Sequence, residues 1–134
     1  MPINGLSIAD NATSLSVTGG TAQVFTPDGQ SVTNGVHVHA AAIADFRVRP
    51  HVTFKNKNPQ RKSDGTFSYG TREMIVTTPY LDTTTGVVYY DTYTVTLRTH
   101  PVIPAANTKN ARYKTAQMLF DADLENFHTA GDLS

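Results

Sequence analysis

The chain has 134 residues, a length that fits one domain with a single hydrophobic core. Its eleven basic and eleven acidic residues balance, and the absence of cysteine excludes a disulfide framework, a thiolate zinc site and a cysteine nucleophile. No stretch approaches the roughly 20 apolar residues of a membrane span, and Met1 to Asn4 lack the features of a signal peptide. We therefore expect an unexported protein without a membrane partner.

The charges are unevenly distributed along the chain. Residues 1–46 contain no Lys or Arg, residues 47–72 contain seven basic residues and one acid, and residues 115–134 contain acids but no base. A neutral chain with this distribution can still present a basic surface, of the kind that concentrates polyanions.

The first elements are predicted from turn sequences. Two short β-prone segments, residues 14–17 and 22–25, flank Gly19 and Gly20, which can adopt the positive φ angles of a tight turn. The sequence therefore predicts an N-terminal β-hairpin. Turns are also predicted at residues 27–29 and 34–35.

Residues 36–40 alternate in polarity and are predicted to form a strand. His37 and His39 share one face of it, a spacing compatible with two metal ligands. No carboxylate lies near them in the sequence, so we interpret them as surface histidines and predict no metal site.

The stretch from residue 45 to residue 57 alternates between two chemistries. Its apolar residues are Phe46, Val48, Pro50, Val52 and Phe54, and between them lie Arg47, Arg49, His51, Thr53, Lys55 and Lys57. In an extended strand this period of two places all the cationic side chains on one face, which predicts an anion-binding surface; the alternative is an ordinary solvated face. Because Pro50 cannot donate to a sheet ladder, it implies an edge strand, a bulge or a break in pairing.

Two further strands are predicted. Residues 69–78 place Met74 and Val76 on one face, opposite Thr71, Glu73, Ile75 and Thr77, and residues 79–86 are predicted to be a loop bracketed by Pro and Gly. Residues 87–99 form the longest strand candidate. One of its faces carries Tyr89, Tyr93, Val95 and Leu97, and the other carries Tyr90, Thr92, Thr94, Thr96 and Arg98.

From about Thr108 the apolar period changes to three or four residues, which predicts an amphipathic helix ending near Gly131. The pattern fits one continuous helix or a break near residues 121–123, where either Asp could cap a second helix. The predicted fold is α+β: a single domain over residues 1–134, with an N-terminal β-hairpin, an antiparallel sheet, and a C-terminal helix or helices covering one face.

Enzyme chemistry is not indicated. The sequence lacks a Gly-x-Ser-x-Gly elbow and a glycine-rich phosphate loop, and nothing in it brings His51 or His100 next to Glu73 as an acid–base pair. We predict no enzyme and no cofactor. A sheet with an uncovered basic, threonine-rich face is instead typical of sheet-based RNA-binding proteins.

Several segments carry a resemblance to a known family through their order, their spacing and the total length. They are Gly19-Gly20, Asn34-Gly35-Val36, the basic strand through Lys57, residues 75–79, residues 86–88, Arg98-Thr99-His100-Pro101 and residues 111–127. On them the chain resembles, over essentially its whole length, the coat proteins of the small single-stranded RNA bacteriophages of the levivirus type.

The resemblance implies a virion structural protein that forms a homodimer through its last strands, with the helices interlocking over the partner. Such dimers would assemble in the bacterial cytoplasm into an icosahedral capsid that packages the single-stranded RNA genome. Binding of an RNA hairpin would add translational repression. The alternative is a non-assembling, sheet-based RNA-binding domain.

The resemblance also implies an RNA-binding site on the inner face of the sheet. The corresponding residues are Arg47, Arg49, Thr53, Lys55, Lys57, Thr71, Glu73, Thr94, Thr96 and Arg98. The chain departs from the family at the tyrosine that stacks on a base, because alternation places Tyr93 on the apolar side. Tyr90 could replace it, or a bulge could change the face.

Overall fold

The structure is a computed structural model that describes residues 6–132. Its strands are β1 (Phe25–Pro27), β2 (Gly35–Ala40), β3 (His51–Lys57), β4 (Gly70–Leu81) and β5 (Val88–Thr99), and its helices are α1 (Ala105–Phe120), the short 3-10 turn η1 (Ala122–Leu124) and α2 (Glu125–Ala130). The chain divides into two compact units: Gly20–Pro101, which contains the sheet, and the described parts of Met1–Gly19 and Val102–Ser134, which contain the helices.

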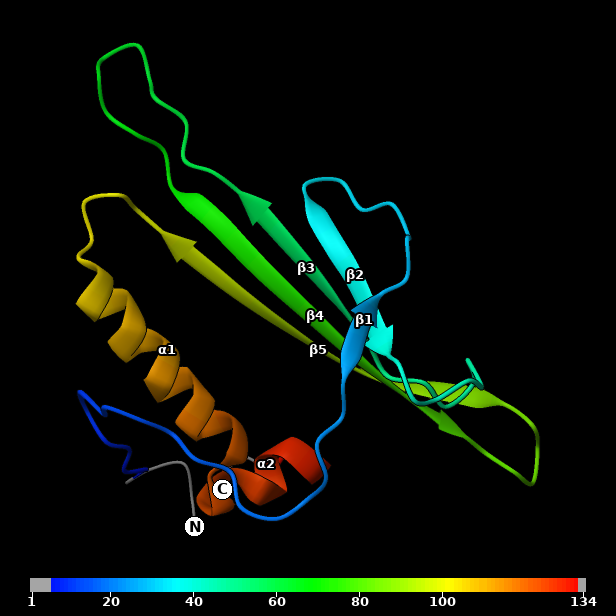
Figure 1. The fold of residues 1–134 in the computed structure, drawn as a ribbon. Helices are drawn as coiled ribbons and strands as arrows, with labels where there is room; N and C mark the ends of the chain where they lie inside the picture. The colour runs from blue at the N-terminus through cyan, green and yellow to red at the C-terminus, as the bar shows by residue number, and fades with distance from the viewer. Residues whose placement is uncertain (1–5, 133–134) are drawn as a thin grey trace. The chain divides into compact units, whose positions relative to one another are not determined.

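The sheet unit is an antiparallel meander in which each strand pairs with the next, in the order β1-β2-β3-β4-β5 (Figure 1). The pairing of β4 with β5 is the longest and continues without a bulge from Gly70 opposite Thr99 to Leu81 opposite Val88. The predicted antiparallel sheet followed by C-terminal helices is confirmed. β5 lies at one edge of the sheet, so its outer backbone groups have no strand beside them in the described chain.

The first hairpin lies later in the sequence than predicted. Residues 14–17 form no strand; the first antiparallel pair is β1 with β2, which begins at Phe25 opposite Ala40. Gly19 and Gly20 do adopt positive φ angles, but they lie where the two units join. A hairpin of two short strands alone, as predicted for residues 14–17 and 22–25, is only marginally stable. The N-terminal segment is attached to α1 instead, through hydrogen bonds made by residues 9–11.

The β3 strand is shorter than the alternating sequence suggests, because it begins only at His51. Asp45 closes a turn immediately before it: the Val48 amide donates to the Asp45 carbonyl, and the Arg47 amide donates to the Asp45 side chain. Pro50 has no N–H to donate, although its carbonyl accepts from Ala40. The break in pairing that the proline predicted is therefore located at the start of the strand.

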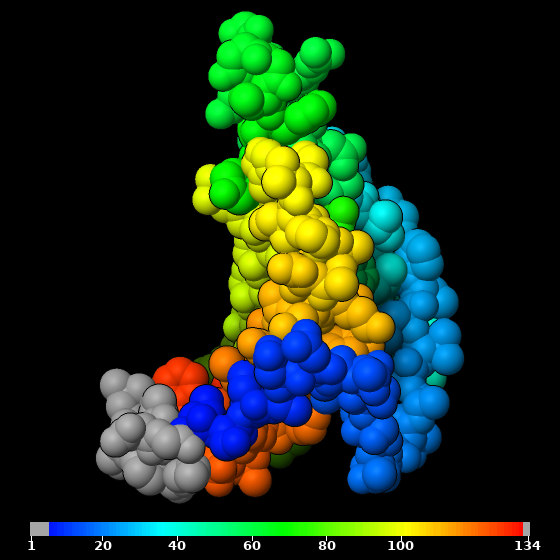
Figure 2. Space-filling model, turned by 90° about the vertical axis from the view of Figure 1, so that its left-hand side faces the viewer, coloured from blue at the N-terminus to red at the C-terminus, as the bar shows by residue number. Residues whose placement is uncertain are grey.

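The connection between β4 and β5 is shorter than predicted, since β4 includes residues 79–81 and leaves only residues 82–87 as a loop. This loop is a closed turn. The Asp82 side chain accepts a hydrogen bond from the Thr84 amide, the Asp82 carbonyl accepts one from Gly86, and Gly86 has a φ of 72°. The connection between β3 and β4 is longer and projects beyond the strand ends (Figures 1 and 2).

The sequence left open whether the C-terminal helix is continuous, and the structure of the helical unit answers this. α1 begins directly after Pro104 and ends at Phe120, where Asp121 adopts an extended conformation and its side chain accepts a hydrogen bond from the Asp123 amide. Gly131, with a φ of 70°, ends α2 as predicted. The C-terminal helix is therefore broken, and Asp121 caps η1, whereas α2 begins after Leu124 without a side-chain cap.

The chain buries few apolar side chains. Among the described residues, the buried apolar side chains are Ala40, Val52, Pro79 and Leu124, and α1 contributes none. Large apolar side chains such as Phe54 and Phe120 remain 44% and 60% exposed. A chain of this length normally buries about two-thirds of its unfolded surface, so the core found here is small for its size.

Candidate nucleic-acid interface

Strand register decides which side chains share a face, because residues directly opposite each other in an antiparallel pair point the same way. One row across the central strands is Lys55, Glu73 and Thr96, and the next is Lys57, Thr71 and Arg98. We call this side of β2 to β5 the polar face; it carries His37, His39, His51, Thr53, Lys55, Lys57, Thr71, Glu73, Ile75, Thr77, Pro79, Tyr90, Thr92, Thr94, Thr96 and Arg98.

The opposite side is the apolar face. Its members are Val36, Val38, Val52, Phe54, Met74, Val76, Tyr93, Val95 and Leu97, with Asn56 and Arg72 at one end. The predicted assignment of both faces of β4 and β5 is confirmed. Tyr93 lies opposite Val76 on the apolar face, and the unbroken register excludes a bulge that would turn it over.

Eight of the ten predicted site residues lie together on the polar face. These are Thr53, Lys55, Lys57, Thr71, Glu73, Thr94, Thr96 and Arg98. The two arginines of the row are exceptions, because Arg47 and Arg49 precede β3 and do not belong to the sheet. The sequence alternates through Arg47 and Arg49, but the backbone before β3 turns away from the extended conformation. The alternation therefore does not place these two side chains on the polar face.

Arg47 is also electrostatically paired. Its Nε and one terminal nitrogen lie 3.1 and 3.0 Å from the two carboxylate oxygens of Asp45. The side-chain hydrogen bond to Asp45 raises the pKa of Arg47 above its usual range, and the same bond lowers the pKa of Asp45. The row of cations therefore has an acid beside it, and Arg47 is the weakest candidate for a phosphate contact.

The cations within the sheet differ in their surroundings. Lys55 lies directly opposite Glu73, with its Nζ 3.9 Å from a carboxylate oxygen. Lys57 lies opposite Thr71 and faces no acid across the strand pair. An exposed pair at 3.9 Å contributes little stability, but the carboxylate offsets the positive charge of Lys55, so Lys57 and Arg98 are the more available anion ligands.

Arg98 stacks on Tyr69, a contact that alternation alone did not predict. The Arg98 guanidinium carbon lies 4.0 Å from the centroid of the tyrosine ring. Tyr69 immediately precedes β4 and is therefore brought to Arg98 by the pairing of β4 with β5. The signal is visible only once the register is known, because the two residues are far apart in the sequence.

A histidine cluster continues the polar face from the other end of β3. His37 Nδ1 lies 2.5 Å from an Asp28 carboxylate oxygen, His37 Nε2 lies 3.2 Å from His51 Nδ1, and His39 Nδ1 lies 3.6 Å from the same Asp28 oxygen. His37 and His39 are only 12% and 20% exposed at their side chains, so they are not the freely solvated histidines that we expected. No carboxylate lies near these histidines in the sequence, whereas the fold brings Asp28 next to both of them.

The environment of His51 favours its neutral form. Burial lowers the pKa of His51, and the nearby charge of His37 lowers it further. A folded-state pKa below the unfolded value of about 6.5 stabilises the fold above that pH, and this stabilisation is lost as the pH falls toward the folded-state value. Asp28, whose pKa is lowered chiefly by the Gln30 amide, loses its contribution only at more acidic pH.

We expect the free energy of unfolding to decrease as the pH falls below about 6.5, and His51→Gln to weaken this decrease because its side chain cannot acquire a proton. Urea unfolding of both proteins between neutral and mildly acidic pH, at one protein concentration, measures the difference. Parallel pH dependences in the wild type and the variant would contradict this assignment.

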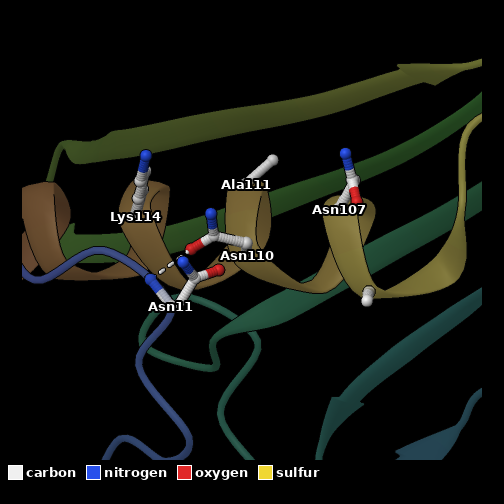
Figure 3. Close-up of a pocket in the computed structure, with 6 residues that line it drawn as sticks. Asn11, Asn107, Asn110, Ala111 and Lys114 are labelled. Carbon is white, nitrogen blue, oxygen red and sulfur yellow. Dashed lines mark hydrogen bonds between the residues drawn. The ribbon is translucent and has the colours of Figure 1, made fainter.

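The helical unit contains a pocket of different character. It is lined by Asn11, Ala106, Asn107, Asn110, Ala111 and Lys114 (Figure 3). The Asn11 amide donates to Asn110 Oδ1 at 2.8 Å, the Asn110 side chain donates to Asp10, and Lys114 Nζ lies 2.6 Å from Asp10. These groups attach the N-terminal segment to α1 and include no nucleophile beside a base, so we assign the pocket a structural role.

Other chemistries find no support in the described residues. Within residues 6–132, no group of three or more His, Cys, Asp or Glu side chains is arranged to hold a metal ion. No helix in this part of the chain is long and apolar enough to cross a membrane. His51 and Glu73 lie on the same face but on different rows, with Thr77 opposite His51 and Lys55 opposite Glu73.

The solved structures that resemble the chain include two virus-like particles. A chain of the "Virus-like particle of bacteriophage GQ-907" superposes with a TM-score of 0.90 and 36% sequence identity, covering 98% of this chain and 99% of that one. A chain of the "Virus-like particle of Beihai levi-like virus 21" matches with a TM-score of 0.53 and 12% identity, covering 85% and 97%, which supports the fold alone. No protein-family model and no curated protein matches the sequence.

Proposed function

The chain belongs to the levivirus-type coat proteins of single-stranded RNA bacteriophages, and from this premise we propose that it self-assembles into the icosahedral capsid of a virion. The observation that carries the proposal is the likeness to a bacteriophage virus-like particle over nearly the whole of both chains. The protein is structural rather than enzymatic, since the structures it matches are particles. The whole chain, residues 1–134, acts as one coat-protein domain in this proposal.

Dimerisation is the first step of the proposed assembly. Two features of the single chain support it: β5 presents a twelve-residue edge, and few apolar side chains are buried. A long unpaired edge rich in Val, Tyr and Thr is a template for pairing with another strand. A second copy that joins β5 to β5 and covers exposed apolar residues would remove both features.

Packaging of single-stranded RNA is the second part of the proposal. The polar face offers Lys57 and Arg98 as cations and Thr94 and Thr96 as hydrogen-bonding groups on adjacent strands. Phosphate contacts of this kind bind RNA without regard to sequence, whereas recognition of one hairpin needs contacts to bases. Repression of translation through an operator hairpin would require such base contacts. Assembly of the dimers into the capsid would take place in the bacterial host cytoplasm.

The test is expression of the full chain in a bacterium, followed by electron microscopy of the purified product and extraction of nucleic acid from it. We expect closed particles that contain RNA. Soluble protein that binds RNA but never forms particles would favour a non-assembling RNA-binding domain instead. Particles that are free of nucleic acid would support the capsid role and contradict the packaging role.

The loop between β4 and β5 is expected to act between dimers rather than within one. Deleting residues 83–85 should alter or abolish particles while leaving dimers intact, because the loop is a self-contained turn outside the paired strands. Thr84→Ala is the matched control, since the hydrogen bond to Asp82 comes from the backbone of Thr84. Gel filtration and electron microscopy give the two readouts. Loss of the folded dimer in the deletion variant would contradict this role.

A further inference from the structure

The contact between Arg98 and Tyr69 differs from the other pairs of this kind in the chain. Two cations of α1, Lys109 and Arg112, lie 5.5 and 5.2 Å from the ring of Tyr113, whereas Arg98 lies 4.0 Å from the ring of Tyr69. At 4.0 Å the guanidinium is in direct contact with the ring. Such pairs occur about once per 70–80 residues and are often purely structural, so location and surroundings must decide their role.

The location is the polar face. Arg98 lies opposite Thr71, which in turn lies opposite Lys57, so the three share one row of the sheet. Because Arg98 lies on this face and its guanidinium contacts Tyr69, the ring also lies on this side of the sheet. Lys57 and Tyr69 are exposed, the latter by 44%, so an incoming ligand can reach both.

The ring is held before any ligand arrives. Beyond its contact with Arg98, it meets the imidazole of His100 edge to face, with ring centroids 5.1 Å apart and planes inclined by 67°. His100 is itself fixed, since its Nε2 donates to the Phe67 carbonyl at 2.9 Å. A side chain already ordered in this way loses little conformational entropy when a planar group stacks on it.

The charge of Arg98 is available. In residues 6–132 the ion pairs at the sheet join Asp28 to histidines, Asp45 to Arg47, and Glu73 to Lys55, and none of them includes Arg98. A guanidinium without a carboxylate partner, stacked on an aromatic ring and exposed, presents a flat cationic surface. Nucleobases stack on such surfaces in single-stranded nucleic-acid complexes, in addition to contacts between cations and phosphates.

We propose that Arg98 and Tyr69 form a stacking subsite for an unpaired nucleobase of single-stranded RNA, with Lys57 contacting a neighbouring phosphate. The inference rests on the proposed RNA binding and adds a base-dependent part to it. Tyr69 thereby becomes a binding residue that is not on β5, although the aromatic residues on β5 were the sequence-based candidates.

The test compares two short single-stranded RNAs of equal length, one with bases and one abasic, so that phosphates are matched and only stacking differs. Full-length, unassembled and RNA-free protein is titrated with each. The wild type should bind the base-bearing RNA about tenfold more tightly, within the roughly 5- to 150-fold range of a single base–aromatic stack. Tyr69→Ala should lose this preference but keep the salt dependence of binding, and Tyr69→Phe should retain both.

Arg98→Lys separates stacking from charge. It keeps the positive charge but lacks the planar guanidinium, so it should lose most of the base preference with little change in salt dependence. Tyr80→Ala, which removes an exposed tyrosine on the same side as the apolar face, is the matched control and should behave as the wild type.

The outcomes are distinguishable. A full base preference in folded Tyr69→Ala would overturn the subsite, as would equal wild-type binding of both RNAs, which would leave RNA binding itself intact. Failure of the wild type to bind either RNA would overturn the proposed RNA binding as well. Loss of the base preference in Tyr90→Ala alone would transfer the stacking role to Tyr90 and overturn the assignment to Tyr69.

Discussion

Sedimentation of the purified chain at micromolar concentration is expected to show a dimer and no folded monomer. The single chain buries only a few apolar side chains, and β5 presents an unpaired edge. An obligate dimer gains its core from the partner, so its unfolding midpoint should rise with protein concentration. A folded monomer, or a midpoint independent of concentration, would contradict obligate dimerisation.

Phe54→Asp should abolish the dimer. Phe54 lies on the apolar face and is 44% exposed in the single chain, so a partner that covers this face would bury the new carboxylate without a counter-charge. An unpaired buried charge costs several kcal/mol even after local relaxation. Thr53→Asp adds the same charge to the polar face of the same strand, away from the β5 edge, and should leave the dimer unchanged. Equal dimer content in the two variants would show that the apolar face is not the covered one.

Local alternation predicted most of the sheet because its cause is local. In an extended chain Lys55 and Lys57 must point away from Phe54, and Thr94 and Thr96 away from Val95, whatever lies beside them. The same rule failed at Arg47 and Arg49. There Asp45 supplies turn hydrogen bonds that compete with extension, and Pro50 prevents the pairing from continuing.

The unpredicted parts of the candidate interface depend on register. Tyr69 meets Arg98 only because β4 and β5 pair without a bulge, and Asp28 meets His37 only because β1 pairs with β2, with Pro27 opposite Val38. The residues of each pair are individually unremarkable in the sequence. No local period connects them, so their shared chemistry could be recognised only from the paired strands.

Binding of single-stranded RNA is expected to weaken steeply with salt, and Lys57→Gln should make this dependence shallower. Each phosphate contact releases condensed counterions, so losing one contact should reduce the slope of log affinity against log salt by about 0.7. Lys57 faces no acid across its strand pair, and replacing an exposed side chain should change stability by less than about 0.5 kcal/mol. Filter binding across a salt series, with thermal melts, measures both.

Removing the acid beside Lys55 should strengthen RNA binding, whereas removing Lys57 should weaken it. Glu73→Gln removes the carboxylate that lies 3.9 Å from Lys55, so the lysine becomes available to phosphate and RNA affinity at low salt should increase.

Arg72→Gln is the matched control for Lys57→Gln, because Arg72 is an exposed cation on the same part of the sheet but on the opposite face. If Arg72→Gln and Lys57→Gln reduce the slope equally, RNA responds only to net charge and the polar face is not its binding surface.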